Sequence, residues 1–283
     1  MKKLIILMLV LLMPLSALAE RVVSLYGSYA EAWLQAGGTL AGVTDDAVRE
    51  RGLDVGDAQI IGTTKMPNLE LILALEPDWV ILNADIAAQM QAKTVLEAAG
   101  VECTAFRVDT WRDYAAMMDE MTVRTDRRDL YESIIPPMER EITALTEKTA
   151  EKKGPKILLL RAYSGGAKVK GTDNLAGVML ADLGCVNVVD LHPSLLEEMS
   201  LEAIITEDPE WIFVTVMGTN EEDALDAVET AIAENPACRG ITAVQRGHIQ
   251  VLPTGLFHYK PNARWAESYR YLYEILYPEQ ETP

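Results

Sequence analysis

The sequence predicts an α/β protein with two similar lobes, each a parallel sheet flanked by helices, joined by one long linker helix. Three observations predict this fold. One block of sequence occurs twice, once in each half of the chain. Short apolar runs alternate with amphipathic segments, which is typical of parallel strands joined by crossover helices. Between the halves lies a charged stretch of helix formers without the glycine and serine of a flexible linker.

The repeated block covers residues 69–80 and again residues 201–212. Leu, Glu, Ile, Pro, an acid, Trp and a β-branched residue recur in the same order. Asn68 and Ser200 stand just before the two copies, and both residue types cap the free N–H groups of a first helical turn. The proline ends each helix, because the residue before a proline is pushed out of the helical region. We therefore expect a short capped helix and then a buried strand in both lobes.

The first 19 residues predict a secretory signal peptide. Lys2 and Lys3 precede an apolar run at residues 4–15, and Ala17-Leu18-Ala19 suits cleavage before Glu20. The run is short for a transmembrane span, and no cysteine follows the cut to carry a lipid. We expect an exported protein without a lipid anchor.

The first lobe is predicted to span residues 20–121. Its strands are expected at residues 21–25, 40–43, 60–62, 79–82 and 101–108. Besides the helix of the repeated block, helices are expected at residues 30–36, 86–99 and 110–121. Gly37 and Gly100 follow two of these helices, where a left-handed C-cap favours glycine.

The linker is predicted at residues 122–153, where charged residues and helix formers dominate. Pro136 and Pro137 interrupt this stretch. Because proline is tolerated in a first helical turn, we expect the main linker helix at residues 138–152. A helical joint of this kind allows small hinge motions and disfavours large ones.

The second lobe is predicted to span residues 154–283. Its strands are expected at residues 156–160, 186–189, 211–216 and 249–252, and its further helices at residues 174–183, 223–233 and 263–276. Residues 161–172 are polar and rich in glycine, and we expect them to form a loop.

Charge and cysteine content exclude several kinds of partner and site. The chain has 25 Lys and Arg against 43 Asp and Glu, and removal of the signal takes the formal net charge from −18 to near −20. So negative a chain is not expected to bind nucleic acid or anionic membranes. Cys103, Cys185 and Cys238 form no metal or redox motif, and we expect at least two of them to be buried.

The sequence contains no recognisable catalytic motif. Gly166 and Gly171 have the spacing of a phosphate-binding loop, but no lysine follows the second glycine to hold a phosphate. His192, His248 and His258 are far apart, and no serine or cysteine stands in a nucleophile motif. We expect no catalytic residues, no resident metal and no intrinsic cofactor.

Polar and aromatic residues follow the predicted strands, at the edge where parallel sheets bind ligands. Two such edges that face each other would form a cleft lined by tyrosines and cations. The residues expected to bind a ligand there are Tyr26, Tyr29, Lys65, Arg161, Tyr163, Phe257, His258 and Tyr259. Ordinary loop packing is the alternative for each of them.

Four stretches resemble a known family: VVSLYGSYAEAWLQAGG, PNLELILALEPDWVIL, DLGCVNVVD and SLEAIITEDPEWIFV. They are similar to the periplasmic binding proteins that supply ABC importers of iron–siderophores, haem and cobalamin. The resemblance covers nearly the whole mature chain, and it implies two α/β lobes, one long linker helix and a periplasmic location. Pro136 and Pro137 depart from the uninterrupted linker of the family, and Ala30 stands where a threonine usually precedes the glutamate.

The resemblance also implies that one acidic residue in each lobe docks on the membrane subunits of the importer. These residues are Glu70 and Glu202. A carboxylate in a first helical turn also meets the positive end of the helix dipole, which contributes about 0.3–1 kcal/mol. The dipole explains a glutamate anywhere in the turn, whereas docking explains the same position in both lobes. The two roles are compatible.

Residue chemistry ranks the ligands implied by the resemblance. A tyrosinate oxygen suits ferric iron, and aromatic walls suit porphyrin or catechol rings. Arg161, Lys168, Lys170 and Lys260 near the second-lobe edge favour an anionic ligand. We rank a ferric siderophore first, haem second and cobalamin third. The expected protein is a monomer that delivers a small iron complex or tetrapyrrole to an ABC importer, and a secreted enzyme is the less favoured alternative.

Overall fold

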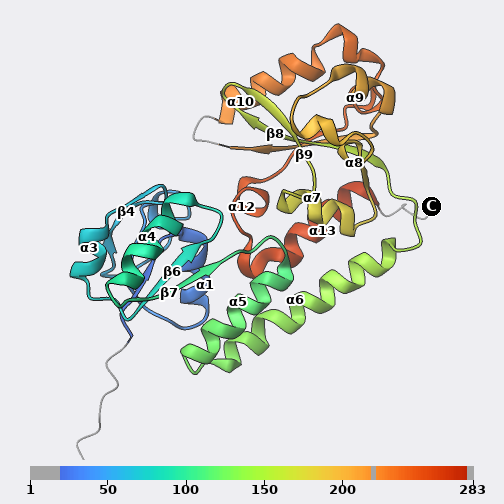
Figure 1. Cartoon of the computed structure of the whole chain (residues 1–283). Coiled ribbons are helices and arrows are strands. Elements are labelled where there is room, and N and C mark those ends of the chain that lie inside the picture. The colour runs from blue at the N-terminus through green and yellow to red at the C-terminus, as the bar shows by residue number, and fades with distance from the viewer. Residues whose placement is uncertain (1–19, 218–220, 279–283) are drawn as a thin grey trace, which may run out of the picture.

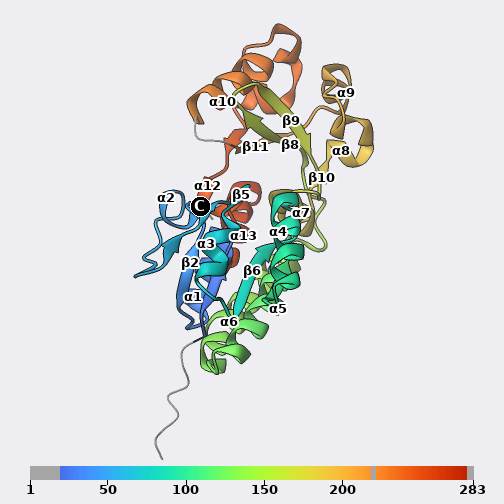
Figure 2. The same cartoon turned by 60° about the vertical axis from the view of Figure 1, so that its left-hand side comes forward.

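The computed structural model describes residues 20–217 and 221–278, so the predicted signal peptide lies outside the described residues. Two α/β lobes lie one above the other, and a long helix runs along one side of both (Figure 1). In the second view the lobes are again separate bodies, with α12 (Thr254–Phe257) between them (Figure 2). Within the described ranges, no helix is both long and apolar enough to cross a membrane.

The first lobe contains a five-stranded parallel sheet in the order β3-β2-β1-β6-β7. Its strands are β1 (Val22–Ser24), β2 (Leu40–Val43), β3 (Gln59–Ile60), β6 (Trp79–Asn83) and β7 (Glu102–Phe106). A small antiparallel pair, β4 (Gly62–Thr63) and β5 (Met66–Pro67), precedes the helix of the repeated block. The helices are α1 (Gly27–Gln35), α2 (Asp46–Arg49), α3 (Leu69–Ala74), α4 (Ala87–Ala98) and α5 (Trp111–Arg124).

The second lobe contains parallel strands in the order β10-β8-β11-β12, and β9 pairs antiparallel with β8. The strands are β8 (Lys156–Tyr163), β9 (Gly166–Lys170), β10 (Val186–Asn187), β11 (Trp211–Val216) and β12 (Ile249–Val251). The helices are α7 (Leu175–Asp182), α8 (Val188–Leu191), α9 (Leu201–Glu207), α10 (Glu221–Val228), α11 (Thr242–Arg246), α12 and α13 (Trp265–Leu276), and the short helical turns are η1 (Pro193–Leu196), η2 (Glu229–Ala233), η3 (Pro236–Gly240) and η4 (Asn262–Arg264).

The two lobes share one chain path, which explains the repeated block. In each lobe the first strand, β1 or β8, is central. A parallel strand that follows a crossover, β2 or β10, pairs on one side of it, and the strand of the repeated block, β6 or β11, pairs on the other side. The predicted caps are confirmed. Asn68 accepts a hydrogen bond from the Leu71 N–H at 3.1 Å, and Ser200 accepts one from the Ala203 N–H at 3.3 Å.

The acid after each proline also has a structural role. The Arg21 N–H, at the start of the first strand, donates to Asp78 Oδ2 at 2.8 Å. In the second lobe the Lys156 N–H donates to Glu210 Oε1 at 3.2 Å. These bonds satisfy a backbone donor that begins a central strand and would otherwise lack a strand partner. The Pro-acid-Trp part of the repeat therefore serves the fold.

The linker helix differs from the sequence-based expectation. Instead of a helix that begins after the proline pair, α6 is continuous over Arg128–Thr149 and contains Pro136 and Pro137. Two prolines free the carbonyls of Glu132 and Ser133, which belong to exposed residues that water can reach. One face of α6 is buried in the core through Ile135, Met138, Ile142 and Leu145. Tertiary packing of this face outweighs the two lost backbone bonds.

One hydrophobic core passes from the first sheet through the joint into the second sheet. It includes Trp79 on β6, Met118 on α5, Met138 on α6, Leu159 on β8 and Tyr269 on α13. All five side chains are at most 4% exposed. Because packed cores resist deformation, the lobes form one stiff body.

Four further expectations are corrected by the structure. The predicted loop at residues 161–172 is wrong, since β8 extends to Tyr163 and forms a hairpin with β9. The predicted strand at residues 186–189 ends at Asn187, whose side chain caps α8. The predicted helix at residues 223–233 becomes a π-helical turn after Val228. The first helix, expected to begin at residue 30, begins at Gly27 and therefore includes Tyr29. The expectation for the cysteines is confirmed, because Cys185 and Cys238 are buried.

We expect a ligand between the lobes to leave the overall dimensions of the protein nearly unchanged, because the continuous core opposes closure. Small-angle scattering with and without a saturating ligand measures this directly. A marked fall in the radius of gyration, as in a hinge-type binding protein, would contradict a stiff joint.

Candidate functional site

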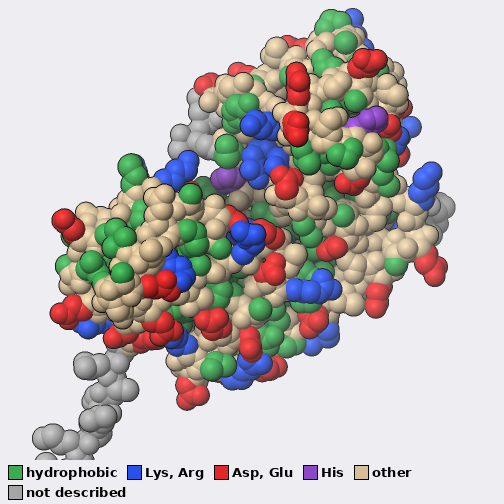
Figure 3. Space-filling view, in the orientation of Figure 1, with side chains coloured by type: hydrophobic (Ala, Val, Ile, Leu, Met, Phe, Trp, Pro, Cys, Tyr) green, Lys and Arg blue, Asp and Glu red, His purple; other side chains and the backbone are tan. Residues whose placement is uncertain are grey.

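The surface of the molecule is hollowed between the two lobes (Figure 3). Lys and Arg side chains gather on the side of the upper lobe, and a histidine lies in the hollow. The α12 segment lies between the lobes (Figure 2). Through His258 it approaches Arg161 of the β8–β9 hairpin, and through Tyr259 it approaches Arg51, which is bonded to Ser28 at the start of α1.

The β8–β9 hairpin brings two cations together. Side chains alternate along β8, so Leu160 and Ala162 are buried while Arg161 and Tyr163 belong to the other face and are half-buried. Arg161 stands directly opposite Lys168 in the antiparallel register. Like charges in directly opposed positions destabilise a sheet pair. The placement of Arg161 opposite Lys168 at this edge of the sheet therefore favours an anionic partner.

His258 lies close enough to this hairpin to be affected by the positive charge of Arg161. It follows α12 directly, and its ring centroid is 4.9 Å from that of Tyr259. Burial, and then the positive charge of Arg161, lower the pKa of His258 below its ordinary value. His258 is thus a neutral imidazole between a cation and a phenol. Phe257 is only 1% exposed and packs in the core, so its ring has almost no surface to offer a ligand.

The first-lobe side is formed by the start of α1 and the β4–β5 turn. Tyr26 is the N-cap residue of α1 and is half-buried. Tyr29 has no exposed surface; its hydroxyl donates to the Phe106 carbonyl at 3.2 Å, and its ring meets that of Tyr26 edge-on at 5.0 Å. Tyr29 is therefore a core residue beneath Tyr26. Lys65 is exposed, in the turn between β4 and β5.

Sequence analysis did not identify Arg51, which joins the two sides. Its side chain is only 10% exposed, is paired with Glu31, and donates from Nη1 to Ser28 Oγ at 3.2 Å. Its guanidinium carbon lies 5.7 Å from the ring centroid of Tyr259, within the range of a cation–π contact. Burial, and then the charge of Glu50, raise the pKa of Tyr259 to about 12, so the phenol is neutral. No sequence signal marks Arg51, which stands in a charged loop typical of a solvated surface.

Further contacts between the lobes are made by residues that come just after Tyr259 in the chain. Asn262 is fully buried, and its Nδ2 donates to the Ser28 carbonyl at 2.7 Å and to Glu31 Oε2 at 2.9 Å. Lys260 Nζ lies 3.3 Å from Asp109 Oδ1. These bonds fix the chain between α12 and α13 on the first lobe. Tyr259 therefore belongs to the second half of the sequence but is held by the first lobe.

Glu70 and Glu202 lie away from this hollow, in the first turns of α3 and α9, one on each lobe (Figure 1). Both side chains are exposed. Neither makes a hydrogen bond or ion pair with any residue that the structure describes. The repeat thus contains two kinds of acid: Asp78 and Glu210 bind the backbone, whereas Glu70 and Glu202 are left available.

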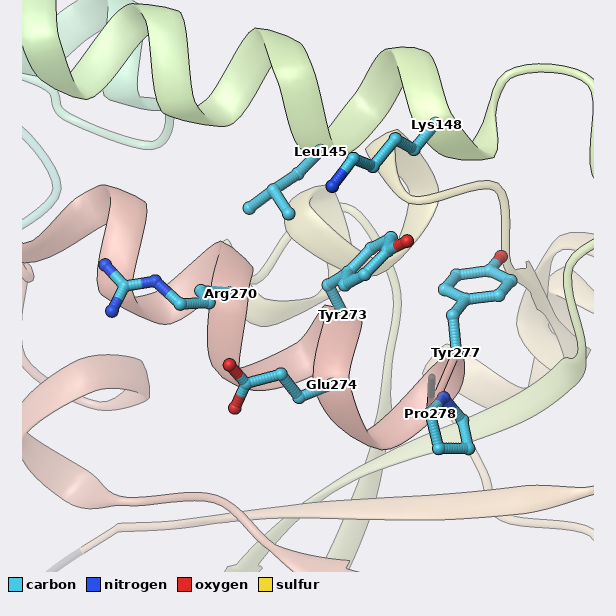
Figure 4. Close-up of a pocket in the computed structure, with 7 residues that line it drawn as sticks. All are labelled: Leu145, Lys148, Arg270, Tyr273, Glu274, Tyr277 and Pro278. Atoms are coloured by element: carbon cyan, nitrogen blue, oxygen red, sulfur yellow. The ribbon is translucent and has the colours of Figure 1, made fainter. Parts of the chain in front are cut away.

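A second depression, a groove of about 540 Å³, lies between α6 and α13. Figure 4 shows Lys148 directed toward the ring of Tyr273, with Tyr277 and Pro278 at one end. Its two cations already have partners. Lys148 lies 5.7 Å from the Tyr273 ring centroid, and Arg270 Nε lies 2.7 Å from Glu141. We therefore place the functional site in the hollow and not in this groove.

The described part of the chain brings no three His, Cys, Asp or Glu side chains together as a metal cage would require. What the hollow offers is cations, phenols and one neutral imidazole. Such a set can bind an anion and pack against flat rings, with hydrogen bonds from the phenols.

Comparisons with known proteins agree with this fold. Residues 22–255 match the family model described as periplasmic binding protein. The Fe(3+)-citrate-binding protein YfmC of Bacillus subtilis is 23% identical over 239 residues, which cover 83% of this chain and 73% of that protein. The structure of the periplasmic haem-binding protein HutB of Vibrio cholerae superposes with a TM-score of 0.73 at 22% identity, covering 92% of this chain and 99% of HutB. That of the periplasmic vitamin B12-binding protein BtuF of Vibrio cholerae gives a TM-score of 0.72 at 16% identity, covering 93% and 99%.

We expect His258 to make the stability of the protein depend on pH. Its folded-state pKa is depressed, so below the unfolded-state pKa of about 6.5 the unfolded chain takes up the proton more readily. Stability is then present above that pH and is lost as the pH falls. Urea unfolding between pH 8 and pH 5 should show a smaller loss for His258→Gln than for wild type. Equal losses, after each protein is referred to its own value at pH 8, would show that His258 is not desolvated.

Proposed function

The chain belongs to the periplasmic binding protein family, and we propose that it captures a ferric siderophore between its lobes and delivers it to an ABC importer. The family is that of solute-binding proteins. One observation carries the choice of ligand: Arg161 and Lys168 stand opposite each other beside His258 and Tyr259. Two adjacent cations and an aromatic wall complement an anionic complex with flat rings.

The residues have distinct roles in this capture. The planar fork of Arg161 pairs with carboxylate or catecholate oxygens, and Lys168 adds a mobile point charge. Tyr26, Tyr163 and Tyr259 supply ring faces and phenol hydroxyls, and Lys65 adds a cation on the rim of the first lobe. The siderophore keeps the iron wrapped, so the protein needs no resident metal or cofactor of its own.

Haem is the second candidate, and one observation favours it. Burial and Arg161 keep His258 neutral, which is the form of imidazole that binds a metal. A neutral histidine beside a tyrosine can ligate haem iron, and the cations can pair with carboxylates on the porphyrin. Cobalamin ranks third, because it has no comparable need for two cations. The relatives described above are named for binding ferric citrate, haem and vitamin B12, which is the same range of ligands.

We propose that the protein is a carrier and not an enzyme, and that it works as an exported monomer in the periplasm. Residues 1–19 read as a cleavable signal. The net negative charge disfavours nucleic acid as a partner. Residues 122–153 would form the linker between a first lobe at 20–121 and a second at 154–283.

Titration of the purified protein tests the ligand assignment. Its absorbance reports any bound chromophore, and quenching of tryptophan fluorescence reports binding of a ferric catecholate, ferric citrate, haemin or cyanocobalamin. We expect the tightest binding for a ferric siderophore, at one per chain. Tightest binding of haemin would favour the second candidate, and turnover without retention of the ligand would favour an enzyme.

We expect Tyr163→Ala and His258→Ala each to weaken binding of the preferred ligand about tenfold or more, which is about 1.4 kcal/mol. Both side chains are half-buried at the hollow and outside the core, so the variants should fold. Arg161→Ala should weaken anionic ligands and spare neutral ones. His192→Ala, far from the hollow and bonded to Glu207 at 2.8 Å, is the control. Wild-type affinity in both Tyr163→Ala and His258→Ala would mean that the site lies elsewhere.

We also propose that Glu70 and Glu202 dock on the importer, because both are exposed and available. A Glu70→Ala, Glu202→Ala double variant should bind ligand and melt nearly as wild type does. It should fail to stimulate ATP hydrolysis by its importer in vesicles. The matched control, Glu147→Ala with Glu234→Ala, removes two exposed carboxylates elsewhere and should stimulate fully. If Gln at positions 70 and 202 lowers stability but supports full transport, the glutamates are helix-start residues only.

A further inference from the structure

Two segments of the chain, each containing one of the two glutamates, hold most of the exposed large apolar side chains. The described residues include twelve large hydrophobic side chains that are exposed. Five of them lie at residues 48–73 and three at residues 191–205: Val48, Ile60, Met66, Leu71, Leu73, Leu191, Leu196 and Ile205. Single exposed hydrophobic residues are ordinary, so the positions of these side chains relative to Glu70 and Glu202 matter more than their number.

The repeat places one of these side chains at the same position in both lobes. Leu73 follows Glu70 by three residues on α3, and Ile205 follows Glu202 by three residues on α9. Residues three apart are neighbours on one face of a helix. Each available carboxylate therefore has an exposed aliphatic neighbour, 37% exposed for Leu73 and 36% for Ile205.

Neither of these aliphatic side chains belongs to the fully buried core of its lobe. The only residue that each of the two helices buries is its isoleucine, Ile72 in α3 and Ile204 in α9. Leu73 and Ile205 leave more than a third of their surface in solvent, and an aliphatic residue recurs at this position in both lobes. A partly exposed aliphatic residue beside an available carboxylate in both lobes points to a shared partner.

We propose that Leu73 and Ile205, with Met66 on the first lobe, form apolar contacts with the two transmembrane subunits of the importer; this rests on the proposed function. Two unpaired carboxylates call for cations on the partner. The same carboxylate and aliphatic pair on both lobes calls for a partner that presents one surface twice, as paired subunits do. Protein interfaces commonly combine an apolar centre with a charged rim.

The first lobe is the stronger anchor in this proposal. Met66, just before α3, is 74% exposed, and Leu71 is 40% exposed. The position of Leu71 corresponds to Ala203 in the second lobe. Methionine adapts its shape to irregular surfaces. Each lobe therefore offers one glutamate to the importer, but the first lobe offers more exposed apolar surface than the second.

Docking affinity at two salt concentrations tests the proposal. The full chain is bound to its importer in lipid nanodiscs at about 0.05 M and about 0.5 M salt, because salt screens exposed charge pairs and leaves apolar contact intact. The test variant is Met66→Ser, Leu73→Ser, Ile205→Ser. Its matched control, Val95→Ser with Val123→Ser, changes two exposed aliphatic residues away from both segments. Titration with the preferred ligand confirms that each variant is folded.

We expect the triple variant to dock at least about tenfold more weakly at both salt concentrations, about 1.4 kcal/mol, while the control docks as wild type. Glu70→Gln with Glu202→Gln should weaken docking mainly at low salt. If the Gln pair weakens docking but the triple variant does not, the apolar contact is refuted and the docking function stands. If neither variant changes docking, both proposals are wrong.

Discussion

The continuous apolar core is the constraint on which the rest of the structure depends. It extends from the first sheet across α5, α6 and α13 to the second sheet without a polar break, with Trp79, Met138 and Tyr269 fully or almost fully buried along its path. Opening or closing the lobes by a large angle would expose part of this core, at roughly 25 cal/mol for each Å² of apolar surface. The shape of the hollow is therefore largely set before any ligand arrives.

The polar contacts across the lobes refine this fixed geometry. Asn262 and Arg51 both engage Glu31, so one carboxylate of α1 holds a loop of its own lobe and a segment from the second half of the chain. Burying a charged group is costly unless it is paired, and here Arg51 pairs with Glu31 through one terminal nitrogen and with Ser28 through the other, while its Nε has no hydrogen-bond partner among the described residues. The consequence is that Tyr259 is held against the first lobe, while Arg161 is oriented by β8 of the second lobe. Both lobes thus contribute to one wall.

The sequence allowed the two-lobed α/β fold and the caps at Asn68 and Ser200 to be predicted, because a repeat reports local chemistry twice. It failed where tertiary packing overrides local preference. The apolar face of α6 carries the helix through Pro136 and Pro137. Ser164 and Gly165 form the turn of a hairpin, which no local pattern distinguished from a loop. Tyr29 and Phe257 were predicted to bind the ligand but are core residues. A position near the end of a strand does not determine which way an aromatic ring points, so the sequence could not reveal this. Arg51 was missed because its partners are distant in sequence.

Hydrogen–deuterium exchange with and without a saturating ferric complex tests most directly whether both lobes hold the ligand in a preformed hollow. The account predicts slower exchange at the start of α1, in the β8–β9 hairpin and around Tyr259, with α3 and α9 unchanged. Protection confined to one lobe, or to the groove between α6 and α13, would contradict it.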